Sequence, residues 1–183
     1  MPGRTPSEAF DAFIDPIQEA LGCLGAAKIV PSPGARQPGA TRAWAVNHGA
    51  GLALKDGWHF ESEMHYEIIP TERASQDRWR ATTRGYRYRI SRSDTDLVLM
   101  HWHPVGHSPF KQPHLHIPEL LGGLRGEKGH LPVSRVTFED AVEWVITMSG
   151  QHARSDWRSV LDRTRQKHLD HRSWSHTPPQ LTP

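Results

Sequence analysis

The segment between Trp58 and Ile69 alternates in polarity, and this alternation constrains the fold more than any other feature of the chain. Successive side chains of a β-strand point to opposite faces. One face carries apolar and small residues, namely Phe60, Ser62, Met64, Tyr66 and Ile68, and the other carries Glu61, Glu63, His65 and Glu67. The pattern predicts a strand with one face on a core and the other in solvent. Asp56-Gly57, directly before it, is a turn signal.

Two further strands follow at short intervals. In residues 79–91, Tyr86, Tyr88 and Ile90 share a face opposite Arg87 and Arg89. Residues 96–103 begin with the apolar run 97–100 and end in histidines, and residues 114–117 favour a short fourth strand. Three strands with short connections predict an antiparallel meander.

Helices are expected at both ends of the chain. Thr5-Pro6-Ser7-Glu8 is a capping box with proline at the first helical position, and Pro16 should kink or split the helix that follows. A second capping sequence at Thr137 opens an apolar stripe that Gly150 ends, and a weaker helix is expected over residues 156–169. The predicted fold class is therefore α+β: a meander sheet of three to five strands with helices packed on one face and extra helices at both termini.

Proline and glycine divide the chain. The sequence contains 15 of each, and residues 31–42 hold three prolines and two glycines, which predicts a linker or loop. We expect an N-terminal helical extension with this linker over residues 1–50 and an α+β core domain over residues 51–150. Residues 151–183 should form a C-terminal helix and a disordered tail.

Charge and cysteine content limit the partners and the cellular location that we expect for the protein. The net charge of +2 gives no global field that would attract nucleic acid, so any electrostatic argument is local. The single cysteine, Cys23, excludes an intramolecular disulfide and a multi-thiolate zinc site, and it favours a reducing, cytoplasmic location. A membrane span needs about 20 apolar residues, which no stretch provides, so no membrane partner is expected.

Six of the 13 histidines fall within residues 101–130, at positions 101, 103, 107, 114, 116 and 130. On a strand, residues i and i+2 share a face, so His114 and His116 would present two imidazoles side by side. Such a pair can act as general base and acid, or it can bind a metal ion. A zinc site made from His101, His103, His114 and His116 is the metal-binding alternative, and a purely structural role is the third reading.

The arginines upstream carry a second signal. Six of them lie between Arg78 and Arg92, interleaved with Trp79, Tyr86 and Tyr88. Arginine and aromatic residues together can hold phosphates and stacked bases. Cross-strand pairing of Arg87 and Arg89 with the glutamates of the first strand is the alternative.

The order of several short motifs resembles a known family. These motifs are Leu-Lys-Asp-Gly57, Gly-Tyr-Arg-Tyr-Arg-Ile90, Leu-Val-Leu-Met100, the turn from His107 to His116, and Phe-Glu-Asp-Ala-Val142. Over about residues 52–148 the chain resembles the TumE-like toxins of bacterial toxin–antitoxin pairs. The resemblance implies a toxin-like protein with an antitoxin partner.

From these observations we expect a protein that acts on nucleic acid, and specifically an RNA-cleaving or RNA-binding enzyme that needs no cofactor. Metal-independent cleavage needs a base, an acid and cations, for which the candidates are His114, His116, Arg87 and Arg89. Substrate contacts are expected from Tyr86, Tyr88, Arg84 and Lys111. The alternatives are a non-catalytic module that binds an antitoxin or a second copy of the chain, and a histidine-ligated zinc protein.

Overall fold

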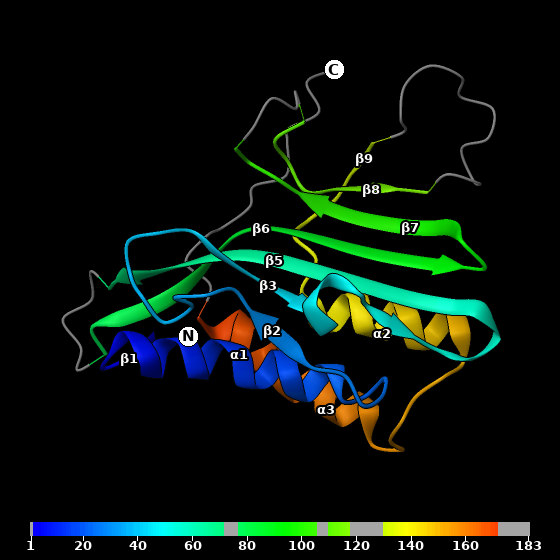
Figure 1. Cartoon of the computed structure of the whole chain (residues 1–183), viewed down its shortest axis with the longest axis horizontal. Helices are drawn as coiled ribbons and strands as arrows, with labels where there is room; N and C mark the ends of the chain where they lie inside the picture. The colour runs from blue at the N-terminus through cyan, green and yellow to red at the C-terminus, as the bar shows by residue number, and fades with distance from the viewer. Residues whose placement is uncertain (1, 72–76, 106–109, 118–129, 172–183) are drawn as a thin grey trace.

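The computed structural model describes residues 2–71, 77–105, 110–117 and 130–171, and these form one antiparallel sheet with helices on one of its faces (Figure 1). The elements in chain order are β1 (Pro2–Gly3), α1 (Pro6–Leu21), β2 (Ile29–Pro31), β3 (Arg42–Val46), η1 (Asn47–Gly49), β4 (Leu52–Ala53), η2 (Lys55–Gly57), β5 (Trp58–Pro70), β6 (Trp79–Arg92), β7 (Thr95–Trp102), β8 (His114–His116), β9 (Leu131–Pro132), α2 (Phe138–Ser149) and α3 (Trp157–Asp170).

The sheet has the strand order β2-β3-β5-β6-β7-β8-β9, with β1 paired to β6 and β4 paired to β5. The α+β class and the meander of β5, β6 and β7 are confirmed, but the expected three to five strands are too few, because the described residues form nine. The strands that were missed are mostly two or three residues long, and so short a segment cannot show a two-residue period.

β5 and β6 form the longest pairing and carry the predicted alternation. Their register runs from Trp58 opposite Arg92 to Pro70 opposite Trp79. Phe60, Tyr66 and other apolar residues of β5 are buried, whereas the polar residues between them are exposed or half-buried. The sheet therefore has a core face and an outer polar face, as the sequence predicts.

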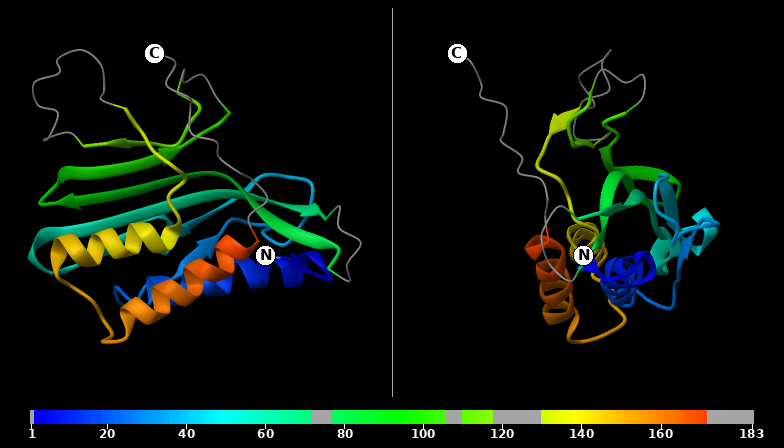
Figure 2. Two further views of the ribbon diagram at one scale, coloured as in Figure 1. Left: turned by 180° about the vertical axis from the view of Figure 1, so that it is seen from behind. Right: turned by 90° about the vertical axis from the view of Figure 1, so that its left-hand side faces the viewer.

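The helices cover the core face of the sheet, as the views from behind and from the end show (Figure 2). α1 begins with the predicted cap, in which Thr5 accepts a hydrogen bond from the backbone N–H of Glu8. The prediction that Pro16 splits this helix is wrong, because Pro16 lies inside one continuous helix and is itself buried. Apolar residues on both sides of it, including Phe13 and Ile17, belong to the same core, which holds the two halves together.

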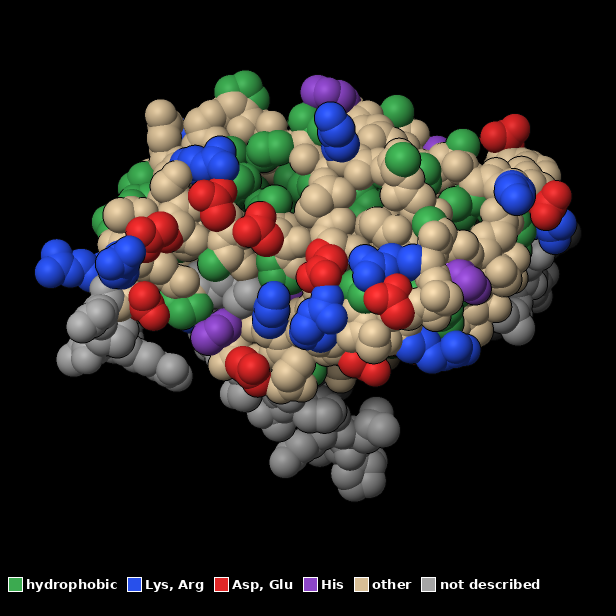
Figure 3. Space-filling view, turned by 90° about the horizontal axis from the view of Figure 1, so that it is seen from below, with side chains coloured by type: hydrophobic (Ala, Val, Ile, Leu, Met, Phe, Trp, Pro, Cys, Tyr) green, Lys and Arg blue, Asp and Glu red, His purple; other side chains and the backbone are tan. Residues whose placement is uncertain are grey.

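α2 and α3 confirm the two predicted C-terminal helices. Thr137 and Asp140 form a complete capping box at the start of α2, and Gly150 ends that helix in the left-handed conformation with φ 69°. α3 is polar on its outer side, where Arg163 pairs with Glu19 of α1. Seen from the helix side, acidic and basic side chains are interspersed on the surface (Figure 3), so this face does not carry a field of one sign.

One hydrophobic core joins the N-terminal, central and C-terminal parts, since a single cluster of buried residues runs from Phe10 to Leu161. The proline-rich segment of residues 31–42 connects the paired strands β2 and β3 and packs inward, where the hydroxyl of Tyr66 donates to the carbonyl of Ala35 at 3.1 Å. The expected disordered tail lies almost entirely outside the described residues. None of the described helices is both long enough and apolar enough to span a bilayer.

Candidate metal site

The site is built where β7, β8 and β9 lie side by side. His101 belongs to β7 and His103 follows that strand, His114 and His116 belong to β8, and His130 directly precedes β9. The register pairs His101 with His114 and Met100 with Leu115. Met100 and Leu115 belong to the core, so the histidines project from the outer face of the sheet.

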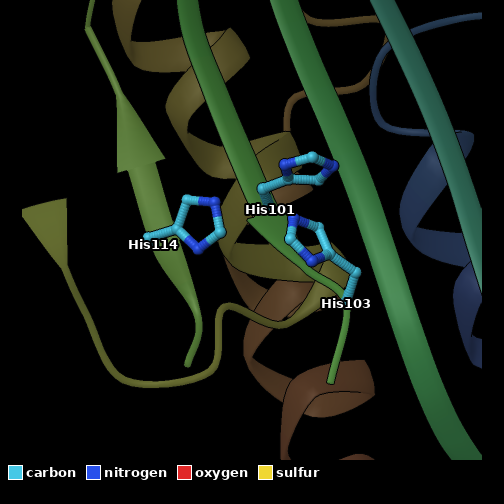
Figure 4. A group of neighbouring side chains, drawn as sticks. All are labelled: His101, His103 and His114. Carbon is cyan, nitrogen blue, oxygen red and sulfur yellow. The ribbon is translucent and has the colours of Figure 1, made fainter. Parts of the chain in front are cut away.

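The five imidazoles form two overlapping groups. The first contains His101, His103 and His114, and the second contains His114, His116 and His130; within each group one ring nitrogen per residue lies within 4.8 Å of the others. Figure 4 shows the first group: the His114 ring extends from β8 toward the rings of His101 and His103 on the neighbouring part of the chain. The ring centroids of His101 and His103 are 4.4 Å apart, and each lies 5.3 Å from that of His114.

His114 belongs to both groups and has a defined tautomer. Its Nδ1 lies 2.7 Å from the carbonyl oxygen of Gln112. Because a carbonyl only accepts, Nδ1 carries the hydrogen and Nε2 keeps a lone pair in the neutral ring. The side chain is 2% exposed, and Nε2 is buried without a hydrogen-bond partner in the part of the chain that the structure describes. A backbone carbonyl on one ring nitrogen with the other nitrogen open is typical of a metal-ligating histidine.

Burial keeps the central histidines neutral. Desolvation, together with the neighbouring rings of His103, His114 and His116, lowers the pKa of His101 to about 4. The pKa of His114 is lowered mainly by burial, against the opposing hydrogen bond to Gln112. A neutral imidazole is the form that binds a metal ion. At neutral pH, His101 and His114 therefore need not lose a proton before they bind.

The spacing suits a first-row transition metal. Zinc–nitrogen bonds of about 2.0–2.1 Å place two nitrogens of a tetrahedral site roughly 3.4 Å apart. The ring nitrogens lie within 4.8 Å of one another, so a pair would have to move closer by at most about 1.4 Å to reach that separation. The described residues place no carboxylate in either group, and an all-imidazole set favours zinc, copper or nickel over calcium or magnesium.

The structure brings together all four histidines of the metal-binding alternative, and it adds His130. That residue was not among the candidates because it stands alone in the sequence before β9. Its ring stacks on Phe110, with 3.9 Å between the centroids, and lies 4.4 Å from that of His116. His107, the sixth histidine of the stretch, lies outside the described residues.

The two arginines expected to stabilise charge are engaged with carboxylates. Glu61 accepts from Nη1 of Arg87 at 3.2 Å and also from Arg89, which in turn donates to Asp96. Burial would raise the pKa of Glu61, but the two guanidinium groups lower it below its usual value. The cross-strand pairing alternative is thus confirmed for Arg87 and Arg89.

The expected substrate-binding residues do not form one site. The rings of Tyr86 and Tyr88 stack on each other within the core, 5% and 0% exposed, on the face opposite Arg87. Base stacking by these tyrosines is therefore a wrong prediction for this fold, because both rings are packed under the helices. Arg84 stays on the surface and pairs with Glu67 at 2.7 Å. Lys111 is exposed, and its carbonyl accepts a hydrogen bond from the indole of Trp102.

A cleft of about 910 Å³ adjoins the first histidine group. It is lined by His101 and His103, by β6 from Arg80 to Arg87, by outer-face residues of β5, and by Arg135. Ligand sites are typically clefts of about 300–1,000 Å³, so this one has the size of a small-molecule site.

Comparison of the chain with protein-family models, with curated proteins and with solved structures found no match.

Proposed function

We propose that this protein binds a transition-metal ion, with zinc as the first candidate, through the histidines of β7, β8 and the start of β9. The observation that carries the proposal is at His114: its Nε2 is buried without a hydrogen-bond partner among the described residues, and a ring nitrogen of this residue lies within 4.8 Å of one from each of His101 and His103. A buried polar atom without a partner costs about 1–3 kcal/mol, and a metal bond would remove that cost.

The first histidine group is the better candidate for a reactive centre. His101 and His103 line the cleft, so a metal ion held by this group would face open space on one side. Three histidines with a fourth position left for water are the ligand set of catalytic zinc, which lowers the pKa of bound water to about 7. In the second group, Phe110 stacks on one face of the His130 ring, and neither His116 nor His130 lines the cleft. We therefore propose hydrolytic chemistry at the first group.

Zinc titration of the full chain, stripped of metal, tests the proposal by calorimetry. His114→Ala removes the ligand shared by both groups, and we expect zinc affinity to fall at least 100-fold. His152→Ala is the matched control, because His152 is an exposed histidine between α2 and α3 and lies outside the cluster. It should bind zinc as the wild type does. Equal zinc affinity in wild type and His114→Ala, with both folded by circular dichroism, would refute the proposal.

Metal-free RNA cleavage by His114 and His116 is the second candidate function. It is favoured by the placement of both rings on one strand face, with 5.0 Å between their centroids. Cleavage of labelled RNA that persists in EDTA and is lost in His114→Ala would support it. Cleavage that EDTA abolishes would assign the histidines to metal. An antitoxin partner and a second copy of the chain stay predictions, which light scattering of the purified protein tests.

A further inference from the structure

The cleft beside the histidines lies where β7 ends and β6 continues without it. The last register pair of the two strands is Tyr86 with Trp102, so residues Trp79 to Gly85 of β6 extend past the end of β7. A Cβ atom on Gly85 would lie 2.9 Å from the carbonyl oxygen of Trp102. Glycine therefore allows the chain leaving β7 to pass close to β6, at a position that itself lines the cleft.

A β-bulge places Arg84 at this cleft. The β5–β6 register pairs His65 with Gly85 and Tyr66 with Thr83, which leaves Arg84 as the extra residue. A bulge redirects the side chain of the unpaired residue, and bulges are common beside functional sites. The Arg84 guanidinium is held by Glu67: its Nε donates a hydrogen bond to Oε2, and its Nη2 lies 2.7 Å from the same oxygen in an ion pair. This pairing fixes its position and leaves other N–H groups available, since arginine has five donors.

Cations outnumber anions along the cleft. Its lining includes Arg80, Arg84, Arg87 and Arg135 but only one carboxylate, that of Glu63, which is paired with His65 at 2.8 Å. Arg80 makes no ion pair with any residue that the structure describes. Arg87 is the cross-strand neighbour of His101, so a guanidinium adjoins the first histidine group directly. Arginine is the side chain best suited to bind phosphate oxygens.

We propose that this cleft binds the phosphate group of a phosphate ester, held by Arg80, Arg84 and Arg87 next to the metal site. The inference rests on the proposed function, because it names the substrate class of that site. A phosphate oxygen within reach of Arg87 would also face the ion held by His101. The fixed arginines and the ion would share the negative charge that develops during hydrolysis of the ester. The phosphate could belong to a free nucleotide or to an RNA strand.

Binding of two probes to the full chain tests the inference, without zinc and in EDTA. The probes are adenosine monophosphate and a ten-nucleotide single-stranded RNA, each measured at low and high salt. We expect Arg80→Gln and Arg84→Gln each to weaken binding at least tenfold. Arg154→Gln is the matched control, because Arg154 is an exposed arginine paired with Asp156 far from the cleft. It should bind as the wild type does.

The outcomes separate this inference from the proposed function. Binding of the mononucleotide would assign a nucleotide-sized ligand, and binding of RNA alone would assign a polynucleotide. Either result supports phosphate binding in the cleft if Arg84→Gln weakens that binding. Binding of neither probe, or equal loss in Arg154→Gln, overturns the inference. Zinc affinity is measured on the same proteins and should stay within twofold in Arg84→Gln. If the wild type binds phosphate but not zinc, the metal site fails and the anion site stands; the reverse result refutes the anion site alone.

Discussion

His168 on α3 donates a hydrogen bond from Nδ1 to Oε1 of Glu139 on α2, across a distance of 2.8 Å. Glu139 is 0% exposed, and its other carboxylate oxygen has no hydrogen-bond partner among the described residues. His168 lies close to solvent at 16% side-chain exposure and is the partner through which this buried carboxylate is satisfied. The contact ties together the two C-terminal helices beneath the sheet.

Replacing His168 with alanine should destabilise the protein strongly. Removal of one partner from a buried pair leaves the other unsatisfied and costs about 3–5 kcal/mol. Urea unfolding followed by circular dichroism measures the effect, and His152→Ala should change the free energy of unfolding by less than about 0.5 kcal/mol. The double variant Glu139→Leu/His168→Leu should recover much of the loss. A single variant as stable as the wild type would show that the contact contributes nothing.

Thr137→Ala should lower stability by about 1 kcal/mol, because it removes the side-chain acceptor for the N–H of Asp140 at the start of α2. Thr137→Ser keeps the hydroxyl and should be nearly neutral. The midpoint of thermal unfolding distinguishes the two variants. Equal losses in both would mean that the threonine methyl group, and not the cap, is responsible.

Gly150→Ala tests the end of the same helix. The residue has φ 69°, and a Cβ atom there would meet nothing within 4 Å, so the cost comes from the backbone alone. We expect a loss of about 1–2 kcal/mol in the free energy of unfolding. Gly150→Asn should cost less, since asparagine tolerates this conformation. Denaturant titration of both variants makes the comparison, and a larger loss for asparagine would contradict the backbone explanation.

The thiol of Cys23 should react slowly in the native protein. Burial raises its pKa above the ordinary value of 9.0, so the reactive thiolate is scarce at pH 8. We expect a thiol-specific disulfide reagent to label the folded chain at least tenfold more slowly than the chain in guanidinium. The stability that this neutral thiol contributes is complete below pH 9.0 and is lost as the pH rises through the higher folded pKa. Fast labelling of the native protein at pH 8 would contradict the burial of this side chain.

The long strands could be predicted because their period is visible. β5, β6 and β7 have eight or more residues each, enough for the alternation of Phe60, Met64 and Tyr66 with charged neighbours to show. β1, β4 and β9 are two residues long, and their place in the sheet depends on partners that no local pattern reveals. The same limit applies to residues 31–42, whose prolines indicate a loop but not the hairpin that the loop closes.

Only part of the candidate site could be predicted from the sequence. The same-face relationship of His114 and His116 follows from their spacing, but their approach to His101 depends on the β7–β8 register. The contact between His130 and His116 likewise depends on the pairing of β9 with β8. The roles of Arg87 and Arg89 could not be predicted from the sequence. Arg89 lies opposite Glu61 only because of the β5–β6 register, and Arg87 reaches the same glutamate diagonally.

The candidate histidines lie on or beside β7, β8 and β9, at the opposite end of the sheet order from β2 (Figure 1). Of the residues in β8 and β9, only Leu115 belongs to the hydrophobic core cluster. None of the five candidate ligand histidines belongs to the hydrophobic core cluster of the described residues. His116 of β8 is only partly buried and is not a member of the core cluster, so its replacement should have little effect on how α1, α2 and α3 pack. Under the metal-binding proposal, a change at this residue would alter the metal preference of the site without a redesign of the fold.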